Sequence, residues 1–180
     1  MNIVNPIKEI KDIEKMKQSL SGRDLLLFVF GINSSLRISD ILSLKVGDVR
    51  NKTSLILSEK KTKKRKEFRF NQSLINALNE LIPETASDDD WLFPSKRNAE
   101  KPLDRTQAWR NLNAAAKRSG ITVNIGTHTL RKTWAYHRYK AGYNVAQLMV
   151  ALNHSSQTET LRYIGIEQEQ IDDLYDSINL

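Results

Sequence analysis

The sequence predicts a mainly α-helical domain with one small antiparallel β-sheet. Apolar residues recur at helical spacing along most of the 180 residues. The period changes to alternation only between Thr53 and Phe70, where two short stretches have the pattern of paired strands. The chain contains no internal repeat and no long linker, and its length suits one good core. We therefore expect a single domain over residues 1–180.

The N-terminal part predicts two consecutive helices. Asn5 followed by Pro6 is a capping residue before proline, which is typical of a helix start. Apolar residues then recur on one face, and this helix is expected to end near Gly22. The stretch from Leu25 to Ile32 is apolar nearly all round, which indicates a helix buried in the core.

The middle of the chain predicts a β-hairpin with a basic tip, within Thr53 to Phe70. Leucines at helical spacing follow up to Pro83, and Pro83 to Asp90 is a polar, acidic loop. The hydrophobic run at 91–93 is expected to anchor the chain back onto the core.

The second half predicts further helices. One starts at Asp104 and closes at Gly120, one runs from Thr127 to Gly142, and one starts at the capping residue Asn144 and ends near Asn153. The C-terminal part has the pattern of two short helices split near Gly165.

Composition narrows the function. The formal charge of +7 favours a polyanionic partner, and nucleic acid is the first candidate. The absence of cysteine excludes disulfides, thiolate zinc sites and cysteine nucleophiles, and favours an intracellular protein. The N-terminus lacks an apolar signal core, and no stretch is long enough to span a bilayer. We expect a cytoplasmic protein, associated with the nucleoid if DNA is its partner, with no membrane contact.

Four residues in the last third are of the types needed to break a phosphodiester without a metal: His128, Arg131, His154 and Tyr163. His128 and Arg131 are three residues apart, so on one helix they share a face. Each of the four alone has an ordinary explanation, such as a solvated helix face, a histidine near a helix C-terminus or a packing tyrosine. They form a site only if they converge.

The order and spacing of these residues resemble a known family. Residues 128–131 are His-Thr-Leu-Arg, residues 152–156 are Leu-Asn-His-Ser-Ser, and Tyr163 follows His154 by nine residues. This pattern closely resembles the C-terminal signature of the tyrosine recombinases, the phage integrase family. The family's earlier arginine matches Arg37 in the segment 35–42, and its hairpin lysine matches Lys61. All six expected positions are thus filled in order.

The resemblance implies a role for each position, and the chemistry agrees with it. Two arginines can hold the non-bridging oxygens of a diester, which suits Arg37 and Arg131. Tyrosine has a reference pKa of about 10 and needs positive surroundings and a base, and the resemblance makes Tyr163 the nucleophile. His128 would accept its proton and His154 would donate to a phosphate oxygen. The resemblance assigns protonation of the 5′ leaving group to Lys61, and Lys63 is the alternative.

Further basic residues are candidate DNA contacts. Those of the hairpin are dense enough to predict salt-dependent phosphate binding, although a solvated turn is the plain alternative. Those of the later helices could equally be ordinary surface charge. The hairpin set is Lys60, Lys63, Lys64, Arg65 and Lys66, and the helical set is Arg110, Lys117, Arg118 and Lys132.

The expected reaction needs no cofactor and no metal. A 3′-phosphotyrosyl link stores the energy of the broken bond, and the sequence contains no phosphate-binding loop for ATP. The run Asp88 to Asp90 is the only acidic cluster before the C-terminal tail, and consecutive loop residues point in different directions. We expect a solvated loop there.

The chain departs from the family pattern in two places. Asn153 stands where relatives usually carry glycine, and asparagine tolerates left-handed geometry better than most residues. The usual N-terminal DNA-clamping domain is missing, so we expect a short form of the family, and a fragment is the alternative.

Residues 167–180 hold five acidic residues and no Lys or Arg, and they predict an amphipathic helix. That helix docks on a neighbouring subunit or folds back on its own domain.

The sequence therefore predicts a site-specific recombinase or integrase acting on double-stranded DNA. A homo-oligomer on DNA, as a synaptic tetramer, is the expected assembly, with a possible accessory protein. Two alternatives remain open. One is DNA relaxation of the type IB topoisomerase kind, and the other is a DNA-binding regulator without catalysis.

Overall fold

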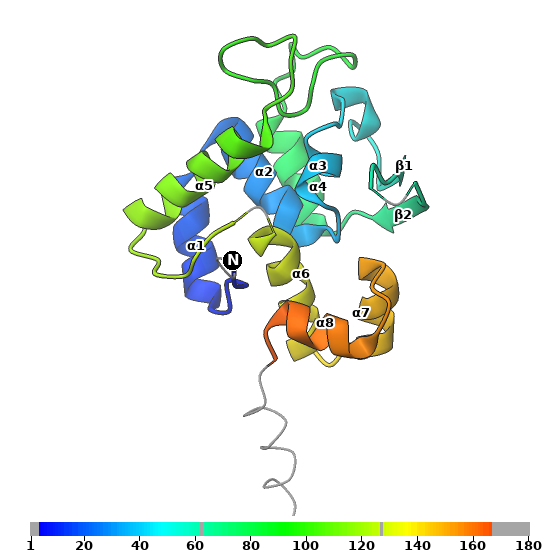
Figure 1. The fold of residues 1–180 in the computed structure, drawn as a ribbon. Helices are drawn as coiled ribbons and strands as arrows, with labels where there is room; N and C mark the ends of the chain where they lie inside the picture. The colour runs from blue at the N-terminus through cyan, green and yellow to red at the C-terminus, as the bar shows by residue number, and fades with distance from the viewer. Residues whose placement is uncertain (1–3, 62, 127, 167–180) are drawn as a thin grey trace, which may run out of the picture.

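The computed structural model describes residues 4–61, 63–126 and 128–166. Its architecture is mostly helical with one two-stranded antiparallel sheet, which confirms the predicted fold class (Figure 1). Besides a short 3₁₀ turn at Val46–Asp48, the elements are α1 (Ile10–Ser19), α2 (Gly22–Asn33), α3 (Ile38–Ile41), β1 (Ser54–Ser58), β2 (Arg65–Arg69), α4 (Gln72–Leu81), α5 (Arg105–Arg118), α6 (Thr129–Lys140), α7 (Val145–Leu152) and α8 (Gln157–Ile164).

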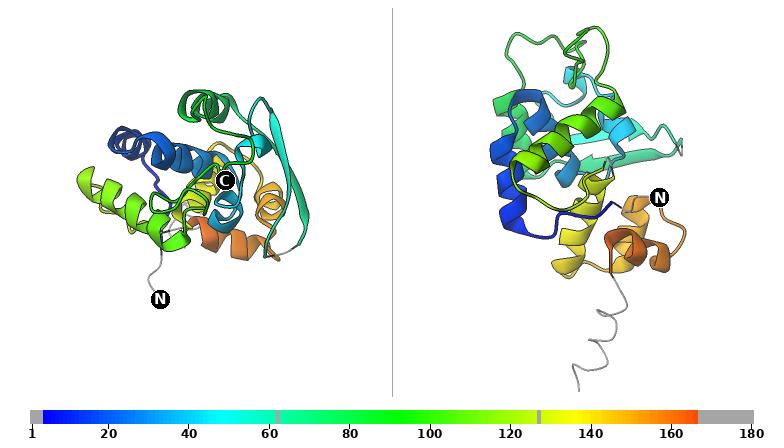
Figure 2. Two further views of the ribbon diagram at one scale, coloured as in Figure 1. Left: turned by 90° about the horizontal axis from the view of Figure 1, so that it is seen from above. Right: turned by 60° about the vertical axis from the view of Figure 1, so that its left-hand side comes forward.

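Helix α2 is the centre of the main core, as its continuous apolar sequence predicts. It packs against α1, α4, α5 and α6, which surround it in both views of Figure 2. Phe30 on α2 is fully buried, and its ring meets Phe68 of β2 and Phe93 edge-on at 6.2 Å between centroids. This aromatic contact fixes the hairpin to the helix.

Gly31 lies where α2 and α6 approach most closely. A Cβ placed on it would come within 2.4 Å of Leu130 Cδ1 and 2.8 Å of Leu130 Cβ. Gly31→Ala gains about 1 kcal/mol of helix propensity. Overpacking costs about 1–3 kcal/mol, and the contact with Cβ cannot be relieved by a rotamer change. We expect net destabilisation by urea unfolding, and less of it in a Leu130→Ala background, where the clashing atoms beyond Cβ are gone.

A second, smaller apolar cluster lies below the main core and joins α6 to α7 and α8. Its buried members are Ala135, Leu152 and Ile164, and Tyr163 is among the residues that pack against them. Helix α6 contacts both groups, because it also packs on α2. The end of α6 that carries Arg131 therefore lies at the junction of the two clusters.

The predicted helix start at Asn5 and Pro6 is wrong. Helix α1 begins at Ile10, and residues 4–9 are not helical. The N–H of the fully buried Ile7 donates to Thr133 Oγ1 at 2.9 Å, and its carbonyl lies 2.9 Å from His137 Nε2. Side chains of α6 thus provide partners for both backbone groups of Ile7 without a helix.

Other local predictions are confirmed. The hairpin pairs β1 with β2 in antiparallel register from Ser54 opposite Arg69 to Ser58 opposite Arg65. The side chain of Asp104 caps α5, and Asn144 caps α7 through a capping box. Among the described residues, no helix is both long and apolar enough to cross a membrane. The predicted acidic C-terminal helix, 167–180, lies outside the described residues.

Candidate active site

Two arginines from distant parts of the chain meet at one buried carboxylate. Arg37 follows α2 at the start of α3, and its Nη1 lies 2.9 Å from Glu59 Oε2. Arg131 on α6 is 3% exposed, and its Nη1 lies 3.9 Å from Glu59 Oε1. The Glu59 side chain is fully buried at the end of the β1 strand. This acid places the two guanidinium groups on either side of itself.

Sequence reasoning missed Glu59. It is the acid that directly follows β1 and directly precedes the run of basic residues from Lys60 to Lys66. A lone acid at the base of a strongly basic turn was the available signal. An unpaired buried acid is costly, so an acid there implies cationic partners.

The ring of Tyr163 meets the rings of His128 and His154. The ring centroid of His154 is 4.8 Å from that of Tyr163, and the His128 centroid is 6.5 Å away, both edge-on. Lys132 Nζ lies 5.1 Å from the Tyr163 ring centroid. The two histidines, Arg131 and Tyr163 are therefore brought together, and Arg37 reaches them through Glu59.

The hydroxyl of Tyr163 is buried. Its neighbour among the described residues is the Arg131 side chain, which is too poorly aligned for a regular hydrogen bond but close enough to favour the ionised form. Burial raises the pKa of Tyr163 to about 12, although the positive charges of Arg131 and Arg37 act in the opposite direction. The tyrosine is thus neutral near neutral pH in this DNA-free form, and a base is needed to ionise it.

Both histidines have lowered pKa values. Desolvation and the charges of Arg105 and Arg131 lower the pKa of His128, and desolvation lowers that of His154 despite the nearby Glu159. His154 is held by Thr160, whose Oγ1 lies 3.1 Å from His154 Nδ1. Neutral imidazoles result near pH 7, which suits proton acceptance.

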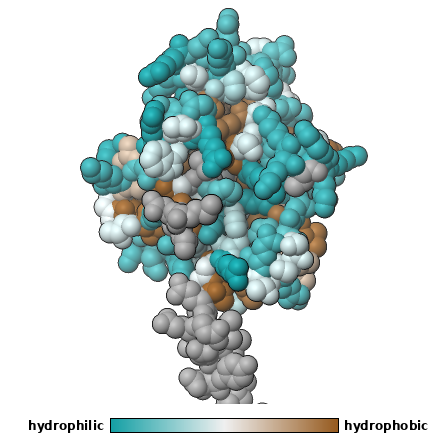
Figure 3. Space-filling view, viewed as in Figure 1, coloured by the Kyte–Doolittle hydropathy of each residue, from teal (hydrophilic) through white to brown (hydrophobic). Residues whose placement is uncertain are grey.

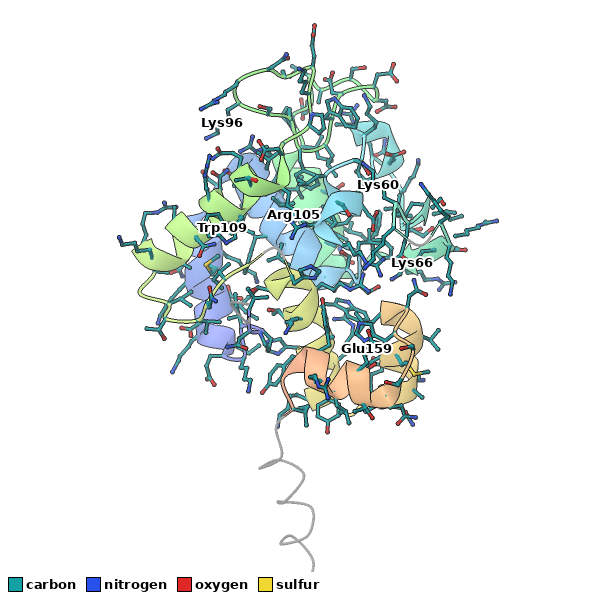
Figure 4. The ribbon with its side chains drawn as sticks, viewed as in Figure 1. Lys60, Lys66, Lys96, Arg105, Trp109 and Glu159 are labelled. Atoms are coloured by element: carbon teal, nitrogen blue, oxygen red, sulfur yellow. The ribbon has the colours of Figure 1, made fainter. Side chains whose placement is uncertain are left out.

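Arg105 is a residue that sequence reasoning did not single out. It lies at the start of α5, near the middle of Figure 4, and its charge acts on His128. In the sequence Arg105 is one of many basic residues and belongs to none of the family's motifs, so nothing marked it as part of the site.

The predicted lysines occupy different environments. Lys61 is exposed, and its charge helps to lower the pKa of Glu159 on α8, one turn before Tyr163. Lys63 is exposed and has a positive φ of 57°. Neither makes a contact with the arginines or with Tyr163 in the described part of the chain.

Lys66 lies inside the site, although the sequence pointed only to a DNA phosphate contact. Its side chain is 11% exposed, donates to the Ala151 carbonyl at 2.5 Å, and lies 3.8 Å from Glu59 Oε1. Figure 4 shows it on the hairpin beside the C-terminal helices. Desolvation, with the charge of Arg131, lowers its pKa to about 8, although Glu59 opposes the shift.

The lowered pKa of Lys66 predicts a pH-dependent stability. Below pH 8 both the folded and the unfolded chain carry the charge, and burying it destabilises the fold. Between pH 8 and 10.5 the unfolded state binds more protons, so the free energy of unfolding should rise with pH, by at most about 3 kcal/mol. Urea unfolding of wild type and Lys66→Met measures the difference. If the free energy of unfolding changes equally with pH in the two proteins, the pKa of Lys66 is not lowered by the fold.

The remaining predicted DNA contacts are mostly on the surface. Arg110 and Lys117 are exposed on α5, and Arg118 donates to the Ser19 carbonyl at 2.8 Å. On the hairpin, Lys64 and Arg65 are exposed, and the N–H of Lys60 donates to Asp40 Oδ1 at 2.9 Å. The face seen in Figure 3 is mostly hydrophilic, with apolar atoms in small separate patches.

Known proteins resemble this chain over nearly its whole length. The model of the phage integrase family matches residues 5–170. The chain is 46% identical over 172 residues to the probable integrase/recombinase YoeC of Bacillus subtilis (strain 168), covering 94% of this chain and 93% of that protein. It spans about half the length of the curated XerC recombinases that it matches, 52% of each.

Solved structures show the same fold. A crystal structure of XerA recombinase superposes with a TM-score of 0.78 at 17% identity, covering 98% of this chain and 65% of that one. XerH site-specific recombinase, bound to palindromic difH substrate in a post-cleavage complex, gives 0.69 at 19% identity, covering 98% and 54%. The family match over nearly the whole chain and the likeness to YoeC establish that this chain belongs to the phage integrase family, the tyrosine recombinases.

Proposed function

We propose that this chain is the catalytic part of a site-specific DNA recombinase that cleaves and rejoins strands through a 3′-phosphotyrosyl intermediate. The observation that carries the proposal is the convergence of Arg37, Arg131, His128, His154 and Tyr163 within one chain. Similar proteins named integrase or recombinase support it. They favour recombination over the two alternatives, a type IB topoisomerase activity and a silent regulator.

The proposed cleavage step is an attack by the Tyr163 oxygen on phosphorus. A new P–O bond forms to tyrosine while the bond to the 5′ oxygen breaks. His128 takes the phenolic proton, and the departing 5′ oxygen takes a proton from a hairpin lysine. Arg37 and Arg131 bind the non-bridging oxygens, where negative charge develops. A 5′-hydroxyl attacking in reverse restores the DNA and releases Tyr163, so no external energy source is consumed.

A bound phosphodiester would change the protonation of the site. Its negative charge raises the pKa of His154 from the lowered value in the DNA-free protein. His154 can then donate to a phosphate oxygen. Arg37, Arg131 and Lys66 carry three positive charges around Glu59, which neutralises one of them. The negative charge of the phosphodiester would balance part of the remainder.

Double-stranded DNA is the proposed substrate. XerH is bound to its DNA in a solved complex, and the basic residues of the hairpin and α5 offer this chain phosphate contacts. Recombination joins strands from separate duplexes, so a homo-oligomer on DNA, a synaptic tetramer, is proposed. An accessory protein could assist it, and the chain would act at the nucleoid.

Covalent capture tests the proposed function. The protein is incubated with a pool of nicked duplexes whose sequence is randomised around the nick, and SDS-stable protein–DNA adducts are isolated and sequenced. A recombinase should enrich one duplex sequence and then exchange strands between two copies of it. Plasmid relaxation without recombinant product would indicate the topoisomerase activity. DNA binding without any adduct would indicate the regulator.

The leaving-group lysine can be identified by chemical rescue. Removal of the true acid should slow cleavage about 10²-fold. The rate should recover when sulfur replaces the bridging 5′ oxygen, because a thiolate leaves without a proton. Lys61→Ala, Lys63→Ala and Lys66→Met are compared on both substrates by the rate of adduct formation. Rescue of Lys66→Met alone would move the role from Lys61 to the buried lysine, whose pKa of about 8 suits proton donation.

A further inference from the structure

We infer that Asn153 is a positioning residue that couples the segment carrying His154 and Tyr163 to the arginine pair through Glu59. The inference rests on the proposed function, and it assigns a task to the residue that departs from the family's sequence pattern.

Asn153 adopts the left-handed backbone that its position demands. It is the C-terminal cap of α7, with φ 51° and ψ 44°, and its N–H donates to the Val150 carbonyl at 3.1 Å. Glycine would satisfy this backbone at no steric cost, and asparagine is among the few other residues that tolerate it. Backbone geometry alone would therefore favour glycine, so the side chain needs a reason of its own.

The side chain of Asn153 reaches the buried acid. Its Nδ2 donates to Glu59 Oε2 at 2.7 Å, across 94 residues of sequence. The same oxygen lies 2.9 Å from Arg37 Nη1. One carboxylate oxygen is thus shared between the cap of α7 and the arginine beside α3. A glycine would leave that oxygen without this donor and the cap without this contact.

The C-terminal end of α7 is tied to the site at three consecutive residues. The Ala151 carbonyl accepts from Lys66, and the Leu152 carbonyl accepts from Arg131. Carbonyls at a helix C-terminus carry partial negative charge and attract cations. Asn153 adds the complementary contact, a neutral donor to the acid that faces these cations. Figures 1 and 2 both show α7 beside the hairpin.

These contacts set the position of His154. It follows Asn153 directly, and its ring meets Tyr163 at 4.8 Å. A shift of the cap moves the histidine and loosens the carboxylate that spaces Arg37 from Arg131. Of the three contacts at the end of α7, the hydrogen bond from Asn153 to Glu59 is the one that acts on the carboxylate between the arginines, and it adds no net charge to the site.

The test uses Asn153→Gly, which keeps the left-handed backbone and removes only the side chain. Adduct formation in single turnover should slow about 10–100-fold, the range for loss of a supporting contact or a small misplacement of a reacting group. DNA affinity should stay within about twofold, because the surface phosphate contacts are untouched. Asn51→Gly is the matched control: Asn51 is exposed with φ 56°, makes none of the contacts of the site, and should react as wild type.

A swap of the two side chains separates positioning from general stability. Asn153→Asp alone brings two carboxylates together and should react more slowly than Asn153→Gly. Adding Glu59→Gln restores an amide–carboxylate pair with the same total charge, and it should recover about tenfold in rate. A purely structural role predicts equal losses in rate, affinity and melting temperature, and no recovery.

The outcomes are distinct. If wild type forms no adduct with any duplex, the proposed function fails and the inference fails with it. If wild type reacts and Asn153→Gly matches it, the inference alone is overturned. A rate loss with unchanged affinity, together with recovery in the swap, establishes the positioning role.

Discussion

Tyr163→Phe should abolish covalent attachment to DNA, a loss of at least about 10³-fold, while leaving the fold and DNA binding intact. Phenylalanine keeps the ring that packs on the small cluster with Leu152 and Ile164. The lost hydroxyl is buried beside Arg131, and that arginine keeps Glu59 and the Leu152 carbonyl as partners, so the fold should survive the change. Denaturing gels measure the adduct, and a filter or gel-shift assay measures binding.

Tyr139→Phe is the matched control for this experiment. Tyr139 packs against the same cluster and also lies outside the main core. It should form adducts at the wild-type rate. An adduct that persists in Tyr163→Phe and disappears in Tyr139→Phe would transfer the nucleophile role, and one that persists in both would show that another residue attacks.

Arg37→Lys should slow cleavage on the order of 10³-fold, although the positive charge is retained. Lysine replaces a planar fork by a single ammonium, so it cannot hold two oxygens of a diester at once. It can still pair with Glu59, which lies 2.9 Å from the arginine, so the acid is not left without a cation and the fold should survive. Single-turnover adduct formation measures the loss, and urea unfolding checks the stability.

Arg50→Lys provides the comparison for an arginine outside the site. Arg50 pairs with Asp88 at 3.0 Å on the loop side of the molecule. Its substitution should leave the cleavage rate unchanged. If Arg37→Lys cleaves as fast as Arg50→Lys, a single positive charge at position 37 is sufficient for cleavage. The proposal that Arg37 holds two oxygens of the phosphodiester would then be wrong.

Local signals predicted most of the fold, and contacts between distant residues account for the errors. The caps at Asp104 and Asn144 act within a few residues, so sequence reveals them. Asn153 was expected to keep the left-handed turn, and it does. The failure at Asn5 arose because α6, more than a hundred residues later, supplies the backbone partners of Ile7.

The same distinction applies to the site. The order of the six family positions pointed to Arg37, His128, Arg131, His154 and Tyr163, and the structure gathers these five around Glu59 and the tyrosine ring. The role of Glu59 in the site and the burial of Lys66 both depend on the docking of α7 against the hairpin. No spacing rule in the sequence expresses that contact.

The division of the apolar residues into two clusters bears on how the protein loses activity. Among the residues that the structure describes, Ala135, Leu152 and Ile164 are the buried members of the cluster that holds α7 and α8 against α6, whereas the main core is far larger. Segments with little buried apolar surface open before the rest of a protein unfolds. His154 and Tyr163 belong to that smaller unit, which is held to the rest of the protein largely by polar contacts at the end of α7. Warming should therefore stop cleavage reversibly at temperatures where the bulk of the helices is still intact.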